Sequence, residues 1–452
     1  MSESQDRGEG AGRRRLMVFH ALLVGLAAGG VAVAFRYLLF ALDLFREAFF
    51  AWSHQFGTWG LVFPLAYSIG GATAGVWLVR RFAPEARGSG IPHLKGVLNG
   101  THLLRWRRVL GVKFAGGLLA IGAGLALGRE GPTVQLGGAT GEALAIGLKL
   151  PPERRRTLIA AGAGAGLAAA FNAPWAGLLF VLEEFQRDFR PIVLVAAFLA
   201  SLLGDLLSRC VFGQGPIYDS GSSQGPAPLG TLPVFVLIGG VSGLFSWVFH
   251  RGLMRTVEGC SKLSGRDATR FTILVGLLVG LAGWYTPIAI GSGHALTTAV
   301  LAEHVALRAV PFWFIWRLAL TLASYGTGAA GGIFAPMLAL GALIGAGVGG
   351  MVRHVFPEMN CAPDAFVVAG MAATLTAIVR APLTALGLTL EMTGAFPQML
   401  PMFVACFCAY MIAEGLRVLP IYEALLARLP PSGGPIQETE RPTPTGHLTG
   451  TS

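Results

Sequence analysis

The sequence predicts an all-α integral membrane protein with an internal inverted repeat and broken, re-entrant helices. Three observations predict this fold class: the composition, a series of long apolar runs, and the recurrence of the same motifs in both halves of the chain. Of the 452 residues, 53% are apolar, only 13% are charged, and 64 are glycine. Soluble globular proteins carry about 25% charged residues and about 7% glycine. The composition therefore disfavours a soluble enzyme, a disordered protein and a nucleic-acid-binding protein.

Apolar runs occupy most of the chain. A transmembrane helix needs about 20 apolar residues, and the runs that meet this length are 16–41, 58–80, 106–127, 192–212, 231–250, 271–290 and 398–416. Two more runs, 157–183 and 364–392, are interrupted by Asn-Ala-Pro and Arg-Ala-Pro, while 88–98 and 128–147 begin at Gly/Pro clusters. We expect these four runs to be broken or re-entrant helices, which transporters use to build binding sites inside the membrane.

Polar segments divide the chain into two membrane halves, 15–213 and 231–430. Residues 1–14 are expected to form a cytoplasmic N-terminal tail, 214–230 an external linker, and 431–452 a disordered C-terminal tail. The net charge of +10 comes from short basic clusters between apolar runs, which the positive-inside rule places in the cytoplasm. These clusters are Arg13–Arg15, Arg80/Arg81/Arg87, Arg105/Arg107/Arg108, Arg154–Arg156 and the segment 251–270. The pattern predicts a multi-pass protein of the cell membrane, a bacterial inner membrane, with its N-terminus in the cytoplasm.

The two halves repeat each other. Residues 161–183 align without gaps on 369–391, and Gly88-Ser89-Gly90 recurs as Gly291-Ser292-Gly293. The segment 128–132 likewise recurs as 332–336, and all three pairs keep their order at offsets of 203 to 208. Duplicated halves with odd numbers of spans sit in the membrane with opposite orientations, the inverted repeat of secondary transporters.

Three motifs rich in glycine and proline open broken helices: GSGIP at 88–92, GREGP at 128–132 and GGIFAP at 331–336. Proline suits the first turn of a helix, and glycine lets the backbone approach a ligand closely. A helix that begins inside a membrane points unsatisfied N–H groups and a positive dipole end at its surroundings, so an anion is the natural ligand. For one motif alone, a kinked helix packed against its neighbours is the better interpretation. Three motifs in a duplicated arrangement favour an anion site.

These motifs, in this order and spacing, resemble the CLC family of chloride channels and chloride/proton antiporters, in its bacterial type without C-terminal regulatory domains. The resemblance covers residues 15–430 and includes a late tyrosine in Leu419-Pro-Ile-Tyr422. It implies a CLC-like fold and a homodimer with one pathway in each subunit. It also implies that chloride is coordinated by the hydroxyls of Ser89 and Tyr422 and by the backbone amides of Ile333 and Phe334. The remaining motif residues implied to shape selectivity are Gly88, Gly90, Ile91, Pro92, Gly128, Arg129, Gly131, Pro132, Gly332, Ala335 and Pro336.

Glu130 is the residue that the resemblance makes the external gate, whose carboxylate competes with chloride. The physics of the position points the same way. A carboxylate among helix N-termini is itself an anion in an anion site, so it and chloride exclude each other, and protonation removes its charge and frees the site. The alternative is a structural ion pair with the adjacent Arg129. Acids at membrane depth are functional by default, so we favour the gate.

Glu183 and Glu184 end the apolar run of the first half. Many antiporters of the resembling family hold a glutamate at the position of Glu184, where it relays protons, whereas typical channels do not. Glu184 therefore favours an antiporter, the alternative being a solvated acid at a helix end. Glu183 recurs as Glu391, and we assign it a structural role.

Two features depart from the family pattern. After GSGIP many relatives carry glutamate, whereas this chain has His93 and, two positions later, Lys95. We interpret His93 as a loop histidine with satisfied hydrogen bonds. The other membrane charges are interpreted as inter-helix pairs or snorkelling side chains; they are Arg36, Lys113, Asp205, Arg317, Arg380 and Glu414.

The alternative functions either lack proton coupling, transport a different anion, or depend on other residues. A passive chloride channel on the same fold is the nearest alternative, and a fluoride exporter agrees less well with Ser89 and GREGP. A remote alternative is an intramembrane serine protease with Ser242 in a GxSG pattern and His250, His294 or His304 downstream. The sequence therefore predicts a transporter and not an enzyme. We expect it to exchange chloride for protons across a lipid bilayer, with no cofactor, no metal and no nucleic-acid partner.

Overall fold

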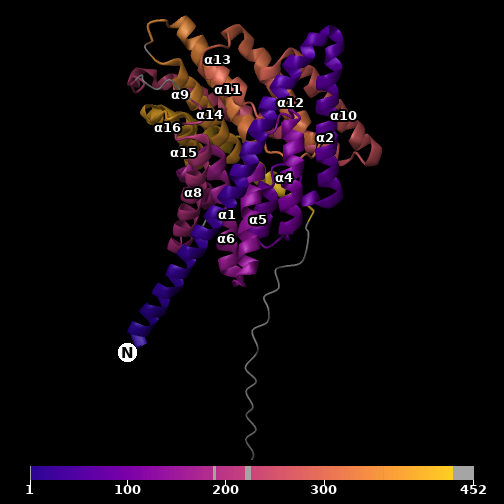
Figure 1. Ribbon diagram of the computed structural model, residues 1–452. Helices are drawn as coiled ribbons and strands as arrows, with labels where there is room; N and C mark the ends of the chain where they lie inside the picture. The colour runs from indigo at the N-terminus through magenta and orange to yellow at the C-terminus, as the bar shows by residue number, and fades with distance from the viewer. Residues whose placement is uncertain (1, 187–189, 219–224, 360, 431–452) are drawn as a thin grey trace, which may run out of the picture.

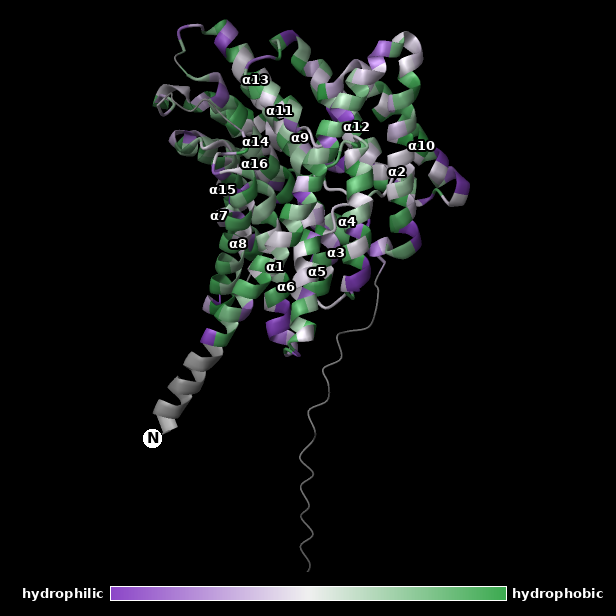
Figure 2. Cartoon of the chain, viewed as in Figure 1, coloured by the Kyte–Doolittle hydropathy of each residue, from purple (hydrophilic) through white to green (hydrophobic). Residues whose placement is uncertain are grey.

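The computed structural model describes residues 2–186, 190–218, 225–359 and 361–430, so the predicted C-terminal tail lies outside the described residues (Figure 1). Within those ranges every regular element is a helix, and no strand is present beyond one isolated bridge. Figure 2 shows apolar residues along most of the helices, with hydrophilic residues gathered toward helix ends and loops. The predicted all-α membrane fold is confirmed.

The helices of the first half are α1 (Ser2–Ser53), α2 (Val62–Phe82), α3 (Ile91–Leu98), α4 (Trp106–Gly122), α5 (Glu130–Gly147), α6 (Pro152–Phe171), α7 (Pro174–Phe180) and α8 (Pro191–Phe212). A π-helical turn, Val181–Gln186, extends α7. Helix α1 begins at Ser2, inside the segment predicted to be a tail, and its N-terminal end projects from the body of the molecule (Figure 1).

The helices of the second half are α9 (Leu232–Ser261), α10 (Gly265–Tyr285), α11 (His294–Leu301), α12 (Val310–Gly326), α13 (Phe334–Val355), α14 (Pro363–Val379), α15 (Pro382–Thr393) and α16 (Met399–Gly415). Helix α17 (Ile421–Leu426) follows them. Short 3-10 turns, Pro84–Ala86 and Pro287–Ala289, precede α3 and α11.

The predicted interruptions occur where left-handed residues end one helix and proline begins the next. Asn172 (φ 52°) ends α6 and Arg380 (φ 68°) ends α14. Two residues later, Pro174 and Pro382 occupy the first positions of α7 and α15. A left-handed C-cap followed by proline at the first helical position is the combination that stops a helix and starts another.

Several predicted spans differ from the helices observed. The run 106–127 forms a helix only to Gly122, because the chain turns at 123–124, where Gly124 has a φ of 95°, and the run 271–290 forms one only to Tyr285. Helix α13 is long and apolar enough to cross a bilayer, yet it is not among the predicted spans. Its glycines at 341, 345 and 349 repeat at four-residue spacing, and each lies against the backbone or a ring of α14. The glycines through which α13 packs on α14 therefore lie within a helix that can span the membrane.

The two halves contact each other reciprocally. Gly88 N donates to Ala329 O (3.0 Å), and its counterpart Gly291 N donates to Gly124 O (2.8 Å). Helices α2 and α10 have 21 residues each, α3 and α11 have 8, and α4 and α12 have 17. Equivalent elements with exchanged partners are what a two-fold relationship between the halves produces, as the predicted inverted repeat requires.

Candidate functional site

The N-termini of α5 and α13 meet at a backbone bridge between the two halves. Gly128 N donates to Gly332 O (2.7 Å), and Gly332 N donates to Gly128 O (2.8 Å). A Cβ added to Gly332 would lie 3.1 Å from the Gly131 amide nitrogen, so glycine permits this approach. The two motifs that the sequence predicts to converge are therefore in contact.

The GSGIP loop approaches the start of α5. A Cβ on Gly131 would collide with Ser89 Oγ, which places the Ser89 hydroxyl at the first turn of that helix. Gly88 (φ 63°) and Gly90 (φ 84°) adopt left-handed conformations that turn the chain into α3. All three predicted motifs thus lie together.

Lys113 holds this loop in place. Its side chain is fully buried, and Nζ donates to the carbonyls of Gly88 (2.6 Å) and Ala86 (3.0 Å). Arg317, its counterpart in α12, donates to Ala289 O (2.8 Å), which is equivalent to Ala86 in the other half. The interpretation of Lys113 and Arg317 as ion-paired or snorkelling residues is wrong, because both satisfy buried loop carbonyls.

Tyr422 lies in α17, which packs against α3. Its ring is fully buried and it neighbours Ser89. The hydroxyl oxygens of Ser89 and Tyr422 are both buried without a hydrogen-bond partner in the described part of the chain. Two orphaned hydroxyls side by side suit an anion, to which both can donate.

Tyr325 is a residue that the sequence analysis missed. Its hydroxyl would lie 2.8 Å from a Cβ on Gly88, and it contacts the backbone of Ser89. No motif includes Tyr325, which is the last but one residue of α12 and precedes the GGIFAP segment. Its proximity to Ser89 depends on the packing of the second half against the first, which local sequence does not show.

Glu130 is the first residue of α5 and is 2% exposed. Its carboxylate contacts the backbone amides of Ala335 and of Glu130 itself, so it lies at the N-termini of both α13 and α5. Oε2 also lies against Gly128, where a Cβ would collide with it. Within the described residues no ion pair joins Glu130 to Arg129, although the charge of Arg129 acts on the carboxylate. The carboxylate therefore lies at helix N-termini, where an anion is favoured.

Ile333 and Phe334 begin α13. Ile333 is its N-cap residue and Phe334 its first residue, and both are buried. The Phe334 ring lies 5.8 Å from that of Phe171, at the end of α6. These contacts fix the start of α13 next to the break after α6, where their amides are available to an anion.

Glu184 lies in the π-helical turn after α7 and is 4% exposed. Its Oε1 is 2.8 Å from Lys95 Nζ, and Lys95 is also 3.3 Å from Glu423 Oε1. Glu184 is therefore a buried, ion-paired acid, and the alternative of a solvated helix end is wrong. Lys95, whose meaning the sequence left open, has a defined partner.

Glu183 has the structural role predicted for it, and so does Glu391. The Glu183 carboxylate accepts hydrogen bonds from the amides of Leu383 (3.1 Å) and Thr384 (2.7 Å), which start α15. Glu391 accepts from the amides of Trp175 (3.1 Å) and Ala176 (2.9 Å), which start α7. Each acid caps the broken helix of the opposite half.

The remaining predictions divide. His93 is buried on α3, not in a loop, with Nδ1 3.2 Å from Gln135 Nε2. Arg380 and Glu414 form the expected inter-helix pair (2.8 Å), whereas Arg36 donates to Asn172 Oδ1 (2.6 Å). Asp205 pairs within its own helix α8, with Arg209.

Ser242, the nucleophile of the protease alternative, is buried on α9. Thr374 Oγ1 donates to its hydroxyl (3.2 Å), which joins α9 to α14. His250 lies on the same helix two turns further on. The arrangement is that of a packing contact between helices.

The fold and the site define a multi-pass membrane transport protein in which broken helices from two repeated halves meet at a buried polar centre. The family model described as voltage gated chloride channel matches residues 70–414. The H(+)/Cl(-) exchange transporter ClcA of Klebsiella pneumoniae is 40% identical over 420 residues, which cover 91% of this chain and 88% of that protein. The protein of the same name from Salmonella typhi is 39% identical with the same coverage.

Solved structures agree. A slow cyanobacterial Cl-/H+ antiporter superposes with a TM-score of 0.88 at 33% identity, covering 91% of this chain and 97% of that chain. A CLC-type fluoride/proton antiporter shares the fold, with a TM-score of 0.72 at 21% identity over 89% of this chain and 96% of that chain. This chain belongs to the voltage gated chloride channel (CLC) family.

Proposed function

We propose that the chain is a chloride/proton antiporter in which Glu130 and chloride alternate at one anion site. The observation that carries the proposal is the Glu130 carboxylate at the amide of Ala335, where α5 and α13 begin. Ionised, the carboxylate occupies the helix ends that attract chloride. Protonated, it loses that attraction and yields its place. One group then links chloride movement to proton movement.

Chloride is proposed to bind between the hydroxyls of Ser89 and Tyr422 and the amides of Ile333 and Phe334. The orphaned hydroxyls and the two helix starts supply donors without a full positive charge. An ion held by dipoles and neutral donors can bind and still leave, as conduction requires.

Glu184 is proposed to exchange protons with the solution on its own side of the membrane. It neighbours Tyr422, which places an ionisable acid next to the anion pathway. The curated relatives are named as exchange transporters, which favours an antiporter over a passive channel on the same fold.

The test is to reconstitute the protein in vesicles, impose a chloride gradient, and record chloride and pH at the same time. An antiporter moves protons against their own gradient in strict proportion to chloride. Chloride flux without proton movement would identify a channel and contradict the proposal.

The family resemblance supports a homodimer with one pathway in each subunit. In the single chain, helices α8 and α16 expose large apolar side chains, among them Leu206 (53% exposed) and Phe407 (67% exposed). Such a surface suits either lipid or a second subunit. The mass of the purified protein in detergent, measured by light scattering, distinguishes the two.

The basic clusters support a cell-membrane protein with a cytoplasmic N-terminus. Arg80 and Arg81 end α2, and 154–156 begin α6. Reporter fusions at the N-terminus and in the 214–230 linker test this orientation, because they should report opposite sides of the membrane.

A further inference from the structure

Lys95 joins two acids that come from different elements. Its Nζ lies 2.8 Å from Glu184 Oε1 and 3.3 Å from Glu423 Oε1. The side chains of Lys95 and Glu184 are only 9% and 5% exposed, whereas that of Glu423 is 35% exposed. The ammonium group therefore neutralises a buried acid and keeps a second, more accessible acid within reach.

The same two elements carry the proposed anion donors. Lys95 is on α3, which Ser89 precedes, and Glu423 follows Tyr422 on α17. The ion pair thus fixes the turn that holds Glu184 against the elements that hold the chloride site. A buried carboxylate beside a cation is stabilised in its ionised form, and an opposite charge within about 4–6 Å has a large effect on protonation.

We propose that Lys95 is a positioning residue that keeps Glu184 ionised and so sets how acidic the adjacent solution must be before the relay accepts a proton. This inference rests on the proposed antiport and adds its regulation. The lysine charge therefore makes proton entry in this chain demand a lower pH than a neutral residue at position 95 would.

The charges around Glu184 are consistent with this role. From α17, Glu423 and Tyr422 face it, and from α3, Lys95 does. Glu183, on the same turn, is directed to the start of α15. On α6, which also packs against the turn, the charged residues are confined to the first turn, 153–156.

The experiment measures proton flux through reconstituted protein as a function of pH on the Glu184 side. Lys95→Met should move the midpoint of that profile upward by about one to two pH units, because Glu184 loses the ammonium group that lies 2.8 Å from its Oε1. Lys95→Arg, which keeps the charge, should leave the midpoint near that of the parent. Glu423→Gln should move the midpoint downward, because the charge of Lys95 is then no longer shared between the carboxylates of Glu184 and Glu423.

The outcomes separate this inference from the proposed function. Chloride flux of Lys95→Met in a Glu130→Gln background shows that the variant is folded and open. A Lys95→Met profile that coincides with the parent, or a Lys95→Arg profile that moves as far, would overturn the role of the lysine charge. An unmutated protein that moves chloride without protons would overturn the antiport instead.

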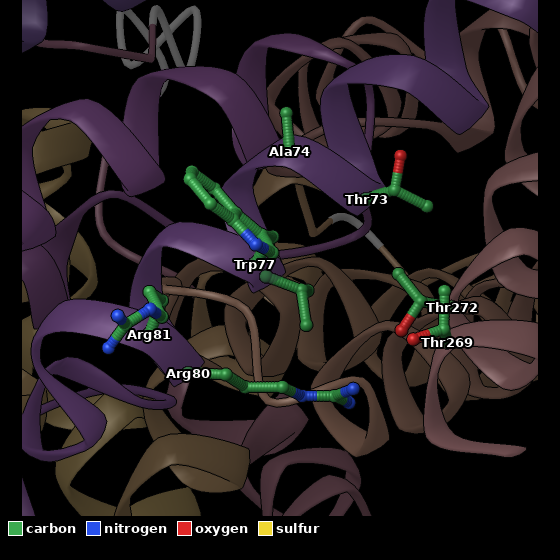
Figure 3. A pocket seen from close by; sticks show the side chains of 8 residues that line it. Thr73, Ala74, Trp77, Arg80, Arg81, Thr269 and Thr272 are labelled. Atoms are coloured by element: carbon green, nitrogen blue, oxygen red, sulfur yellow. The ribbon is translucent and has the colours of Figure 1, made fainter. Parts of the chain in front are cut away.

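A second observation stands apart from the anion site. A groove of about 530 Å³ lies between α2 and α10, and none of the residues that line it belongs to the three motifs (Figure 3). Its lining runs from small and apolar side chains to two arginines: Thr73, Ala74, Val76, Trp77, Thr269, Thr272, Arg80 and Arg81. Trp77 is 58% exposed. The groove is apolar along α2 and basic at the end of that helix.

The basic end of the groove has no acid to balance it. Arg80 donates to the Thr327 carbonyl (3.1 Å), and Arg81 forms no ion pair with any described residue. The acid closest in sequence on α10, Asp267, is paired with Arg270 (3.0 Å). An amphipathic groove with uncompensated arginines at its basic end has the charge that matches an anionic phospholipid.

We infer that this groove binds one anionic phospholipid, with the phosphate at Arg80 and Arg81 and an acyl chain along Val76 and Trp77. The test is native mass spectrometry of the purified protein titrated with phosphatidylglycerol or phosphatidylcholine. Phosphatidylglycerol should be retained in preference, and Arg81→Gln should weaken its retention about fivefold. The control is Arg107→Gln, an exposed arginine outside the groove.

Three results would contradict the lipid site. These are equal retention of the two lipids, an Arg81→Gln variant that binds phosphatidylglycerol as the parent does, and equal loss in Arg107→Gln. Competition by glycerol phosphate alone would assign the site to the free phosphate and not to a lipid.

Discussion

At the scale of single residues, the anion site depends on side chains that the motifs name and on others that they do not. The roles of Ser89, Glu130 and Tyr422 were predicted from the resemblance of their motifs to those of the CLC family. Lys113 and Tyr325 were not, because their partners lie 25 or more than 200 positions away in the sequence. A single charged residue in an apolar run indicates that its side chain has a buried polar partner, but the sequence does not identify that partner.

Glu130→Gln tests the gate. Glutamine keeps the shape of the side chain but carries neither a charge nor a transferable proton, so we expect chloride flux to continue and proton coupling to be lost. Paired chloride and pH recordings on reconstituted protein measure both fluxes. Proton pumping by this variant would refute the assignment of Glu130.

Glu184→Gln tests the relay. Removal of a proton-transfer group should lower proton transport by about 10²-fold, while chloride transport changes less, because chloride does not pass through this residue. The ratio of the two fluxes in vesicles is the measurement. An unchanged ratio would leave Glu184 only its structural ion pair with Lys95.

At the scale of helices, the breaks were predictable and the helix lengths were not. Asn-Ala-Pro and Arg-Ala-Pro encode a stop and a start within three residues, a purely local instruction. The end of α4 at Gly122 is followed instead by a turn, after which Gly128 pairs with Gly332 in the other half. Long-range backbone pairing of this kind leaves no periodic signal in the sequence.

Close packing of α5 on α6 gives a prediction at this scale. A Cβ on Gly137 would collide with the backbone of Gly162, and one on Gly162 with the backbone of Gly137. Gly137→Ala should therefore lower the free energy of unfolding by about 1–3 kcal/mol, because the helices must separate. Thermal unfolding in detergent measures the loss.

The matched control is Gly147→Ala at the end of the same helix. A Cβ there meets nothing within 4 Å, and alanine is the better helix former. It should be neutral or slightly stabilising. Equal losses in the two variants would show that the contact of Gly137 with Gly162 is not the cause, because helix propensity favours alanine at both positions.

At the scale of the whole molecule, each repeated motif contacts residues that adjoin the equivalent motif in the other half. Lys113 and Arg317 hold equivalent loops, Gly128 and Gly332 pair with each other, and Asn172 and Arg380 end equivalent helices. The sequence repeats predicted that the halves correspond. They could not predict the exchanged contacts, because an alignment of two segments does not state how they pack.

Exchanged capping by Glu183 and Glu391 tests this two-fold design. Each carboxylate accepts two backbone N–H groups at the start of a helix in the other half, so each contributes charge-assisted hydrogen bonds across the same interface. Glu183→Gln and Glu391→Gln should each lower the free energy of unfolding by about 1.5–3 kcal/mol. The two losses should be similar, because the geometry repeats.

Thermal unfolding of the two variants beside Glu47→Gln, an exposed acid on α1, supplies the measurement and its control. The losses in the free energy of unfolding should not be additive in the double variant. Helices α7 and α15 contact each other, so a shift of one alters the cap of the other. A neutral Glu391→Gln beside a destabilising Glu183→Gln would mean that only one half depends on its cap. The repeat would then be a record of duplication without a shared structural function at this interface.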